Sequence, residues 1–274
     1  MSILVATGGA AHSIVALTFG AHLAAVCQGT VVVLTVIMRD EERSKAETIL
    51  ESARFVLDSL HTPYKTLIRV GHPAEEIIAE TEANPYQMVV VGEKQYHSLF
   101  TRFVLGATAL RVVEHASCPV VVVKGQIGEV RRVLLCDSGH QAPALIERVG
   151  QQLPHLLDGV EDITVLHVMS QITAGFGVDT DLVHADAEAL IREHEAEGEM
   201  LQRDVQGLSR QGHPSTPKVR HGLVVDEILA EANEGNYDLI IIGAHQGSGW
   251  RRILLDDIAH QIVVGLNRPV LVMR

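Results

Sequence analysis

Glycines occur in the first half of the chain at three places where an aliphatic run ends or a helical segment begins. Gly8 and Gly9 follow the first aliphatic run, Gly92 closes the fourth, and Gly106 precedes a segment with helical periodicity. A glycine lets a ligand approach the backbone closely, and a helix N-terminus offers free N–H groups and a positive dipole end. These positions favour a site for an anionic ligand. Two plainer interpretations stay open, a tight turn at Gly8 and Gly9 and a close helix–sheet contact at Gly106.

Groups that could carry catalysis are scarce in the sequence. Asp256 and Asp257 are adjacent and near the start of a predicted helix, which indicates capping before acid–base chemistry. The loops that carry the glycines contain no nucleophile–base pair and no carboxylates at acid–base spacing. The 15 histidines share no ligand spacing, and Cys27, Cys118 and Cys136 stand singly. We expect no catalytic residues, no metal site and no disulfide framework.

The charge balance limits the class of partner. The 274 residues include 22 Lys and Arg and 34 Asp and Glu, which gives a net charge of −12. Nucleic-acid binding needs clustered basic residues, and an acidic surface is repelled by nucleic acid and by anionic membranes. The sequence has no signal-like start and no apolar run near the ~18 residues that a spanning helix needs. We expect a cytoplasmic protein that binds neither nucleic acid nor membrane.

Alternating strands and helices must position the glycine loops. Strands are predicted at Ile3–Ala6, Thr30–Ile37, Tyr64–Val70, Met88–Val91 and Pro119–Val123, and helices at His12–Cys27, Glu41–Leu60, Pro73–Thr81 and Phe103–His115. This alternation predicts a doubly wound α/β domain with a five-stranded parallel sheet. Ligands of such sheets bind beyond the carboxyl ends of the strands, where the strand order switches. The loops at 7–10, 38–40 and 92–106 are the ones expected to meet there.

The chain contains this unit twice. Gly71 and Gly222 begin matching ten-residue segments, and the same spacing relates Tyr86 to Tyr237. A two-copy period this long indicates duplicated domains rather than a solenoid. We predict a first domain at 1–124, a linker at 125–130 and a second domain at 131–274 with an inserted loop near 170–182. The charged run Asp186–Asp204 is interpreted as a solvated helix face.

Several short motifs carry a resemblance to a known family. They are the strand that ends in Gly92, the Gly-x-Pro turn at Gly71, the Leu105-Gly106 pair before a helix, and the Cys118–Val122 final strand. Together they are similar to motifs of the universal stress proteins, and the resemblance extends over both halves. It implies two Rossmann-like domains of the adenine nucleotide alpha-hydrolase type, related by a pseudo-twofold axis.

The resemblance also implies how the domains associate. Universal stress protein domains pair through their last strands, so Val120–Val123 is expected to pair with Val270–Met273 inside one chain. A long aliphatic edge strand left uncovered would promote aggregation, and this pairing covers it. A further homodimer of two such chains stays open.

A nucleotide site is the functional implication of the resemblance. ATP-binding members use Gly-x2-Gly-x9-Gly-Ser/Thr after the fourth strand and an Asp after the first. Gly92 and Gly106 match the outer glycines, but Gln95 takes the second position and Ala107 lacks the hydroxyl. The Asp is replaced by the stretch 7–10. We expect an eroded site that binds ATP or AMP in the first domain only, with candidate contacts at Thr7, Gly8, Gly9, Val36, Gly92, Gly106 and Ala107.

The second domain places acid where a phosphate would bind. Its equivalent positions are Gly139, Val168, Gly243, Gln246, Gly247, Asp256 and Asp257, and the two aspartates fall on the Gly-Ser/Thr of the motif. At about 5 Å and an effective dielectric near 20, each close pair of like charges opposes binding by roughly 3 kcal/mol. We expect this domain not to bind ATP in the family's manner. The insertion near 170–182 is either an exposed loop or a lid over this second site.

Three functional classes fit these features. The first is a non-catalytic stress-response or regulatory protein with a degraded nucleotide site. The second is a weak ATP or nucleotide hydrolase that uses the loop 92–106, and the third is a partner-binding module with both pockets vestigial. The scarcity of catalytic groups favours the first.

Overall fold

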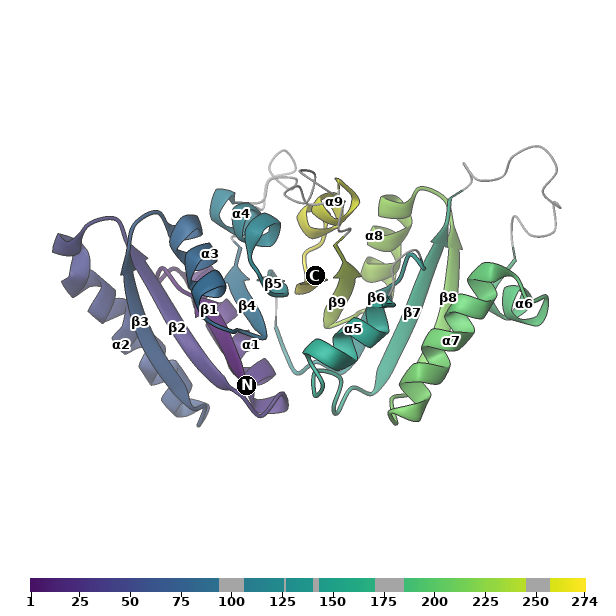
Figure 1. Ribbon diagram of the computed structural model, residues 1–274, viewed down its shortest axis with the longest axis horizontal. Coiled ribbons are helices and arrows are strands. Elements are labelled where there is room, and N and C mark those ends of the chain that lie inside the picture. The colour runs from purple at the N-terminus through teal and green to yellow at the C-terminus, as the bar shows by residue number, and fades with distance from the viewer. Residues whose placement is uncertain (94–105, 126, 140–142, 171–184, 245–256) are drawn as a thin grey trace.

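The computed structural model describes residues 1–93, 106–125, 127–139, 143–170, 185–244 and 257–274. Its ribbon forms two similar halves on either side of a central seam (Figure 1). The predicted site residues Gln246, Gly247 and Asp256 lie outside the described ranges, as do Gln95 and most of the insertion near 170–182.

The first half alternates strands and helices as the sequence predicts. Its elements are β1 (Ser2–Ala6), α1 (Ala11–Val26), β2 (Thr30–Ile37), η1 (Asp40–Glu42), α2 (Arg43–Ser59), β3 (Tyr64–Val70), α3 (Pro73–Ala83), β4 (Met88–Gly92), α4 (Ala107–His115) and β5 (Val120–Val123). The predicted start of the fourth helix at Phe103 is wrong. Gly106 is the N-cap and has an extended backbone (φ −61°, ψ 143°), so α4 begins at Ala107.

The second half repeats the order, with α6 in the place that η1 has in the first half. Its elements are β6 (Arg132–Cys136), α5 (Leu145–Gln152), β7 (Asp162–Met169), α6 (Ala187–Arg192), α7 (Ala196–Arg210), β8 (Ser215–His221), α8 (Val224–Glu234), β9 (Leu239–Gly243), α9 (Asp257–Gly265) and β10 (Val270–Met273). Among the described residues, every helix is too short or too polar to span a bilayer.

The charged run Asp186–Asp204 is not the single solvated helix face that the sequence predicts. His194 has a left-handed backbone (φ 58°), and this conformation separates α6 from α7. The side chain of Asp204 is buried in α7, with the residue 1% exposed. Periodicity identified the helical character but not which carboxylate faces the core.

All ten strands form one sheet in the order β3-β2-β1-β4-β5-β10-β9-β6-β7-β8. Each half is a parallel five-stranded sheet whose order switches between its first and fourth strands, and β3 and β8 form the outer edges (Figure 1). At the seam, β5 and β10 pair antiparallel in the register Val120–Val272, Val121–Leu271 and Val122–Val270. The predicted fold class and the pairing of the two halves through their last strands are confirmed.

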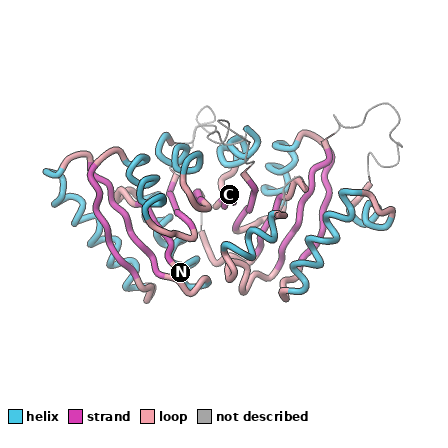
Figure 2. The backbone as a smooth tube through the Cα atoms, in the orientation of Figure 1, coloured by secondary structure: helices cyan, strands magenta, loops and turns pink. Residues whose placement is uncertain are grey.

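Side chains alternate between two hydrophobic cores, one on each face of the sheet. Ile3 and Val5 belong to one core and Leu4 to the other, as the two-residue period of a strand requires. Helices α1, α2, α5 and α7 supply the first core, and α3, α4, α8 and α9 supply the second. Figure 2 shows the magenta strands of each half with cyan helices beside them. Coverage of both faces explains the unbroken aliphatic runs.

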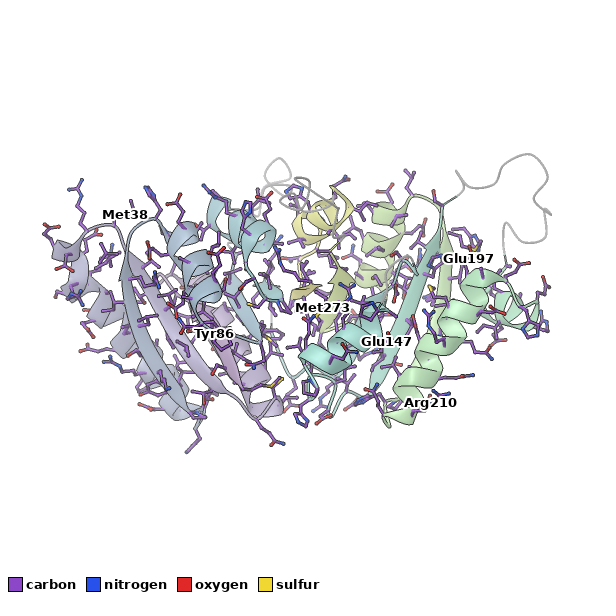
Figure 3. All side chains as sticks on the ribbon, viewed as in Figure 1. Met38, Tyr86, Glu147, Glu197, Arg210 and Met273 are labelled. Carbon is purple, nitrogen blue, oxygen red and sulfur yellow. The ribbon has the colours of Figure 1, made fainter. Side chains whose placement is uncertain are left out.

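An ion-pair cluster recurs in both halves at the spacing of the sequence repeat. In the first half an arginine of β3 bridges two glutamates of α3, and a tyrosine hydroxyl donates to the second glutamate; Tyr86 is labelled in Figure 3. The partners and distances are Arg69–Glu76 (2.6 Å), Arg69–Glu80 (2.7 Å) and Tyr86–Glu80 (2.8 Å), followed by Arg220–Glu227 (2.7 Å), Arg220–Glu231 (2.9 Å) and Tyr237–Glu231 (2.8 Å). The duplication therefore extends to side-chain contacts.

Each half also ends in a basic residue that contacts the last helix of the other half. Lys124 Nζ donates to the carbonyl oxygens of Val263 and Val264, at 2.7 and 3.2 Å, near the C-terminus of α9. Arg274 Nη2 donates to the carbonyl oxygen of Val113, near the C-terminus of α4. Cations are favoured at helix C-termini, where backbone carbonyls lack partners. The two contacts tie the halves together across the seam.

Candidate nucleotide site at the strand switch

A pocket of about 440 Å³ opens where the strand order of the first half switches. It lies at the carboxyl ends of β1 and β4, which are hydrogen-bonded neighbours. Its described lining includes six of the predicted contacts, Thr7, Gly8, Val36, Gly92, Gly106 and Ala107. Leu34, Ile77 and Val91 supply an apolar wall. The structure thus brings together residues from five separate segments of the sequence.

Gly9 is the predicted contact that does not line this pocket. Its φ of 77° is in the left-handed region, and its N–H donates to the Thr7 hydroxyl at 3.2 Å. The Thr7 hydroxyl in turn donates to the hydroxyl of Ser13 at 3.1 Å. Gly9 therefore makes the turn from β1 to α1, whereas Gly8 faces the pocket with no atom within 4 Å of its Cβ position.

Gly92 allows α1 to pack closely on the end of β4. A Cβ at this position would lie 2.3 Å from the backbone oxygen of His12. Glycine is therefore required here for packing, whether or not a ligand is bound. Its place in the pocket lining is compatible with a second role in binding.

Glu93 is a pocket residue that sequence reasoning missed. It follows β4 directly and is 7% exposed. Its carboxylate oxygens lie 3.0 and 3.2 Å from the Cβ position of Gly106, the N-cap of α4. One feature of the sequence could have identified Glu93 as unusual: the residue at the same place in the second half is the uncharged Ala244.

A second cavity of about 450 Å³ adjoins the first and shares its residues His12 and Glu93. Lys124 lines this cavity and is 8% exposed. Burial lowers the pKa of the Lys124 ammonium to about 8, and the charge of Glu93 opposes that shift. Since the Lys124 ammonium donates to α9, this side of the pocket is coupled to the other half of the molecule.

The second half carries a buried polar cluster that the sequence predictions did not include. Asp137 directly follows β6, as Thr7 directly follows β1 in the first half. Its carboxylate accepts from the N–H groups of Gly139 (2.8 Å) and Leu145 (3.1 Å). Asp204 of α7 contacts it, and burial followed by the Asp137 charge raises the pKa of Asp204 to about 6.

The other predicted residues of the second half are only partly described. Gly139 has φ 72° and makes the turn after β6, as Gly9 does after β1. Val168 packs against the second core, and Gly243 ends β9. Asp257 is the first residue of α9. Because Asp256 lies outside the described ranges, the expected repulsion of phosphate by this acidic pair remains a prediction.

Burial sets the reactivity of the cysteines in the described part of the chain. The cysteines are free, and burial raises the pKa of Cys27 and Cys118 to about 11. A thiol with such a pKa is a poor nucleophile near neutral pH. Within the described ranges, no group of three or more His, Cys, Asp or Glu side chains is arranged to hold a metal ion.

Comparison with known proteins identifies the family to which this architecture belongs. The model of the universal stress protein family matches residues 1–124 and again residues 130–274. The chain belongs to the universal stress protein family. It is a tandem member, because two copies of the family's domain occupy one chain.

Three relatives of this tandem universal stress protein cover between 88% and 100% of its length. A universal stress protein of Mycolicibacterium smegmatis is 24% identical over 249 residues, which cover 88% of this chain and 80% of the relative. The crystal structure of a universal stress protein from Archaeoglobus fulgidus superposes with a TM-score of 0.73 at 17% identity and covers 100% and 98% of the two chains. A functionally unknown protein from Pseudomonas aeruginosa superposes with a TM-score of 0.70 at 14% identity and covers 99% and 92%. At these identities the structural matches establish the fold alone.

Proposed function

We propose that the chain is a non-catalytic stress-response protein that binds an adenine nucleotide, or the corresponding nucleoside, in its first half. The pocket of about 440 Å³ at the strand switch carries the proposal, since six of the seven residues anticipated from the sequence line it. Its size falls within the roughly 300–1,000 Å³ of small-molecule sites. The adenine ligand is inferred from the family, and its placement from the pocket.

The proposed units are a binding domain at 1–124, a linker at 125–130 and a non-binding domain at 131–274. Within the linker, Ile127 and Val130 pack against the first core, so the linker is held against the sheet. The acid at Asp256 and Asp257 is the reason for assigning no ATP site to the second domain.

A nucleotide hydrolase is the competing function. Phosphoryl transfer depends on cations and donors that stabilise charge on the phosphates. In the described lining of the pocket, the charged group nearest the α4 N-terminus is instead the carboxylate of Glu93. That arrangement favours binding without turnover.

The identity of the bound ligand and its turnover distinguish the binding protein, the hydrolase and the partner-binding module. Purified protein is heated to release small molecules, these are identified by mass spectrometry, and ATP, AMP and adenosine are then titrated calorimetrically. Binding without product formation is the expected result. Accumulation of ADP or AMP from ATP would support the hydrolase, and the absence of any adenine ligand would support the partner-binding module.

Gly8→Val tests the location of the pocket. Because the Cβ position of Gly8 is open and faces the cavity, the valine fills ligand space without a steric clash in the fold. We expect affinity for the adenine ligand to fall at least about tenfold, with an unchanged circular dichroism spectrum.

Gly207→Val is the matched control, because Gly207 lies on α7 in the second half and also has no atom near its Cβ position. Affinity should survive this change. Affinity that also survives Gly8→Val, or Gly106→Val at the α4 N-cap, would place the ligand elsewhere.

A further inference from the structure

The carboxylate of Glu93 occupies the part of the pocket that faces the N-terminus of α4. Glu93 is 7% exposed, and its two oxygens lie 3.0 and 3.2 Å from the Cβ position of the N-cap residue Gly106. The N-cap residue Gly106 has no side chain with which to cap this end of α4. The positive end of the helix is thus already next to an anionic group of the protein itself.

A phosphate at the same place would meet this carboxylate. Free N–H groups and the helix dipole are what attract a phosphate to such a position. Two anions a few ångströms apart inside a pocket oppose each other, and the effect is stronger away from bulk water. A ligand hydroxyl would instead be attracted to Glu93, because it donates a hydrogen bond to a carboxylate oxygen.

Among the described residues, Lys124 only partly offsets the charge of Glu93. Lys124 Nζ donates to the carbonyl oxygens of Val263 and Val264, so its donors are directed to α9. Burial also lowers the pKa of Lys124 to about 8, which leaves its charge more easily lost than that of a surface lysine. The imidazole of His12 belongs to the described lining of the same pocket as Glu93.

The remainder of the described lining suits an uncharged ligand. Leu34, Val36, Ile77 and Val91 form an apolar wall against which a base can pack, and Gly8 leaves room beside it. The pocket therefore combines an apolar surface with one buried acceptor near the helix.

We infer that the first half prefers an uncharged nucleoside to its phosphates, and that Glu93 determines this preference. The inference rests on the proposed function and specifies the ligand class of the same pocket. In it, a ribose hydroxyl donates to the Glu93 carboxylate at the place where a nucleotide would present its phosphate. The duplication supplies a comparison, since Ala244 occupies the equivalent position in the second half.

The test is calorimetric titration of the full-length protein with adenosine, AMP and ATP. The proteins are the unmodified chain, Glu93→Ala, which copies the second half, and Glu93→Gln, which keeps the size and removes the charge. Glu51→Gln, at an exposed position on α2, is the matched control for net charge. The loop 94–105 is unchanged in every variant.

We expect the unmodified chain to bind adenosine at least about tenfold more tightly than AMP, and ATP more weakly still. Both Glu93 variants should gain at least about tenfold in affinity for AMP relative to adenosine, and the Glu51 control should leave the ratio unchanged. Equal or tighter binding of AMP by the unmodified chain would overturn the inference, as would a ratio that the Glu93 variants do not change. If no protein binds any of the three probes, the proposed function fails.

Discussion

At the scale of single residues, Asp204 shows how burial decides the charge state of a side chain. Its carboxyl lies against Asp137 in the second half and is 1% exposed, while its charged partner Arg203 is largely exposed. Burial and the Asp137 charge raise the pKa of Asp204 from 3.8 to about 6. The folded state therefore holds this proton more tightly than the unfolded state does.

Asp204 should therefore lower the free energy of unfolding as the pH rises. Between about pH 4 and pH 6 Asp204 holds its proton in the folded state and loses it in the unfolded state, so its contribution to stability falls as the pH rises through this range and then levels off. Arg148, whose guanidinium also senses the Asp137 charge, keeps its charge throughout this range.

Asp204→Asn should remove this pH dependence. The amide is neutral at every pH and can donate to Asp137, so the variant should be about 2 kcal/mol more stable than the unmodified chain at pH 8 and nearly equal at pH 4. Urea unfolding at both pH values measures the difference. Asp40→Asn, at an exposed ion pair, is the control and should show no such dependence. Equal stability of Asp204→Asn and the unmodified chain at pH 8 would contradict the assignment.

At the scale of elements, glycines with similar sequence settings have different roles. Gly8, Gly9 and Gly92 all lie at the carboxyl ends of strands and were predicted together as ligand contacts. The positive φ of Gly9 serves a turn, and the missing Cβ of Gly92 admits the backbone of α1. Gly8 alone of the three has open space toward the pocket.

Gly92→Ala should therefore destabilise the fold. The added methyl would meet the backbone oxygen of His12, which can move only if α1 shifts on the sheet. We expect a loss of about 2 kcal/mol or more in the free energy of unfolding, measured by urea titration. Gly8→Ala makes the same chemical change in open space and should cost less than about 0.5 kcal/mol. Comparable losses in the two variants would refute the close-packing explanation.

At the scale of the whole molecule, the seam between β5 and β10 makes one sheet from two duplicated units. Val121 and Leu271 pair there, and both are fully buried. The contacts of Lys124 with α9 and of Arg274 with α4 cross the same seam. We expect the two halves to unfold together because each covers an apolar edge of the other.

Leu271→Asp should break this cooperativity. It places an unpaired carboxylate in the seam, which costs more than about 4 kcal/mol, and differential scanning calorimetry should then resolve two transitions or a strongly lowered one. Leu223→Asp is the matched control: Leu223 is 62% exposed and is the N-cap of α8, where an aspartate is favoured. A single transition at an unchanged temperature in Leu271→Asp would show that the seam does not couple the halves.

The sequence by itself determined the duplication, the parallel strands and most element boundaries. These depend on local patterns, since aliphatic runs predict strands covered on both faces and a fixed spacing relates Gly71 to Gly222. Six of the seven residues that it predicted as ligand contacts line the pocket. Such loops are predictable because parallel strands bring their carboxyl ends to one edge.

Only the tertiary structure decided which charges are buried and what they face. Glu93, Asp137 and Asp204 look like ordinary surface acids in the sequence, yet each is less than 9% exposed. Burial depends on helices that pack from distant parts of the chain, as α7 does on β7, and no local pattern records that contact. The environment of a carboxylate sets its charge state and its effect on a ligand. The charges buried in both halves therefore depend on how the helices pack on the sheet.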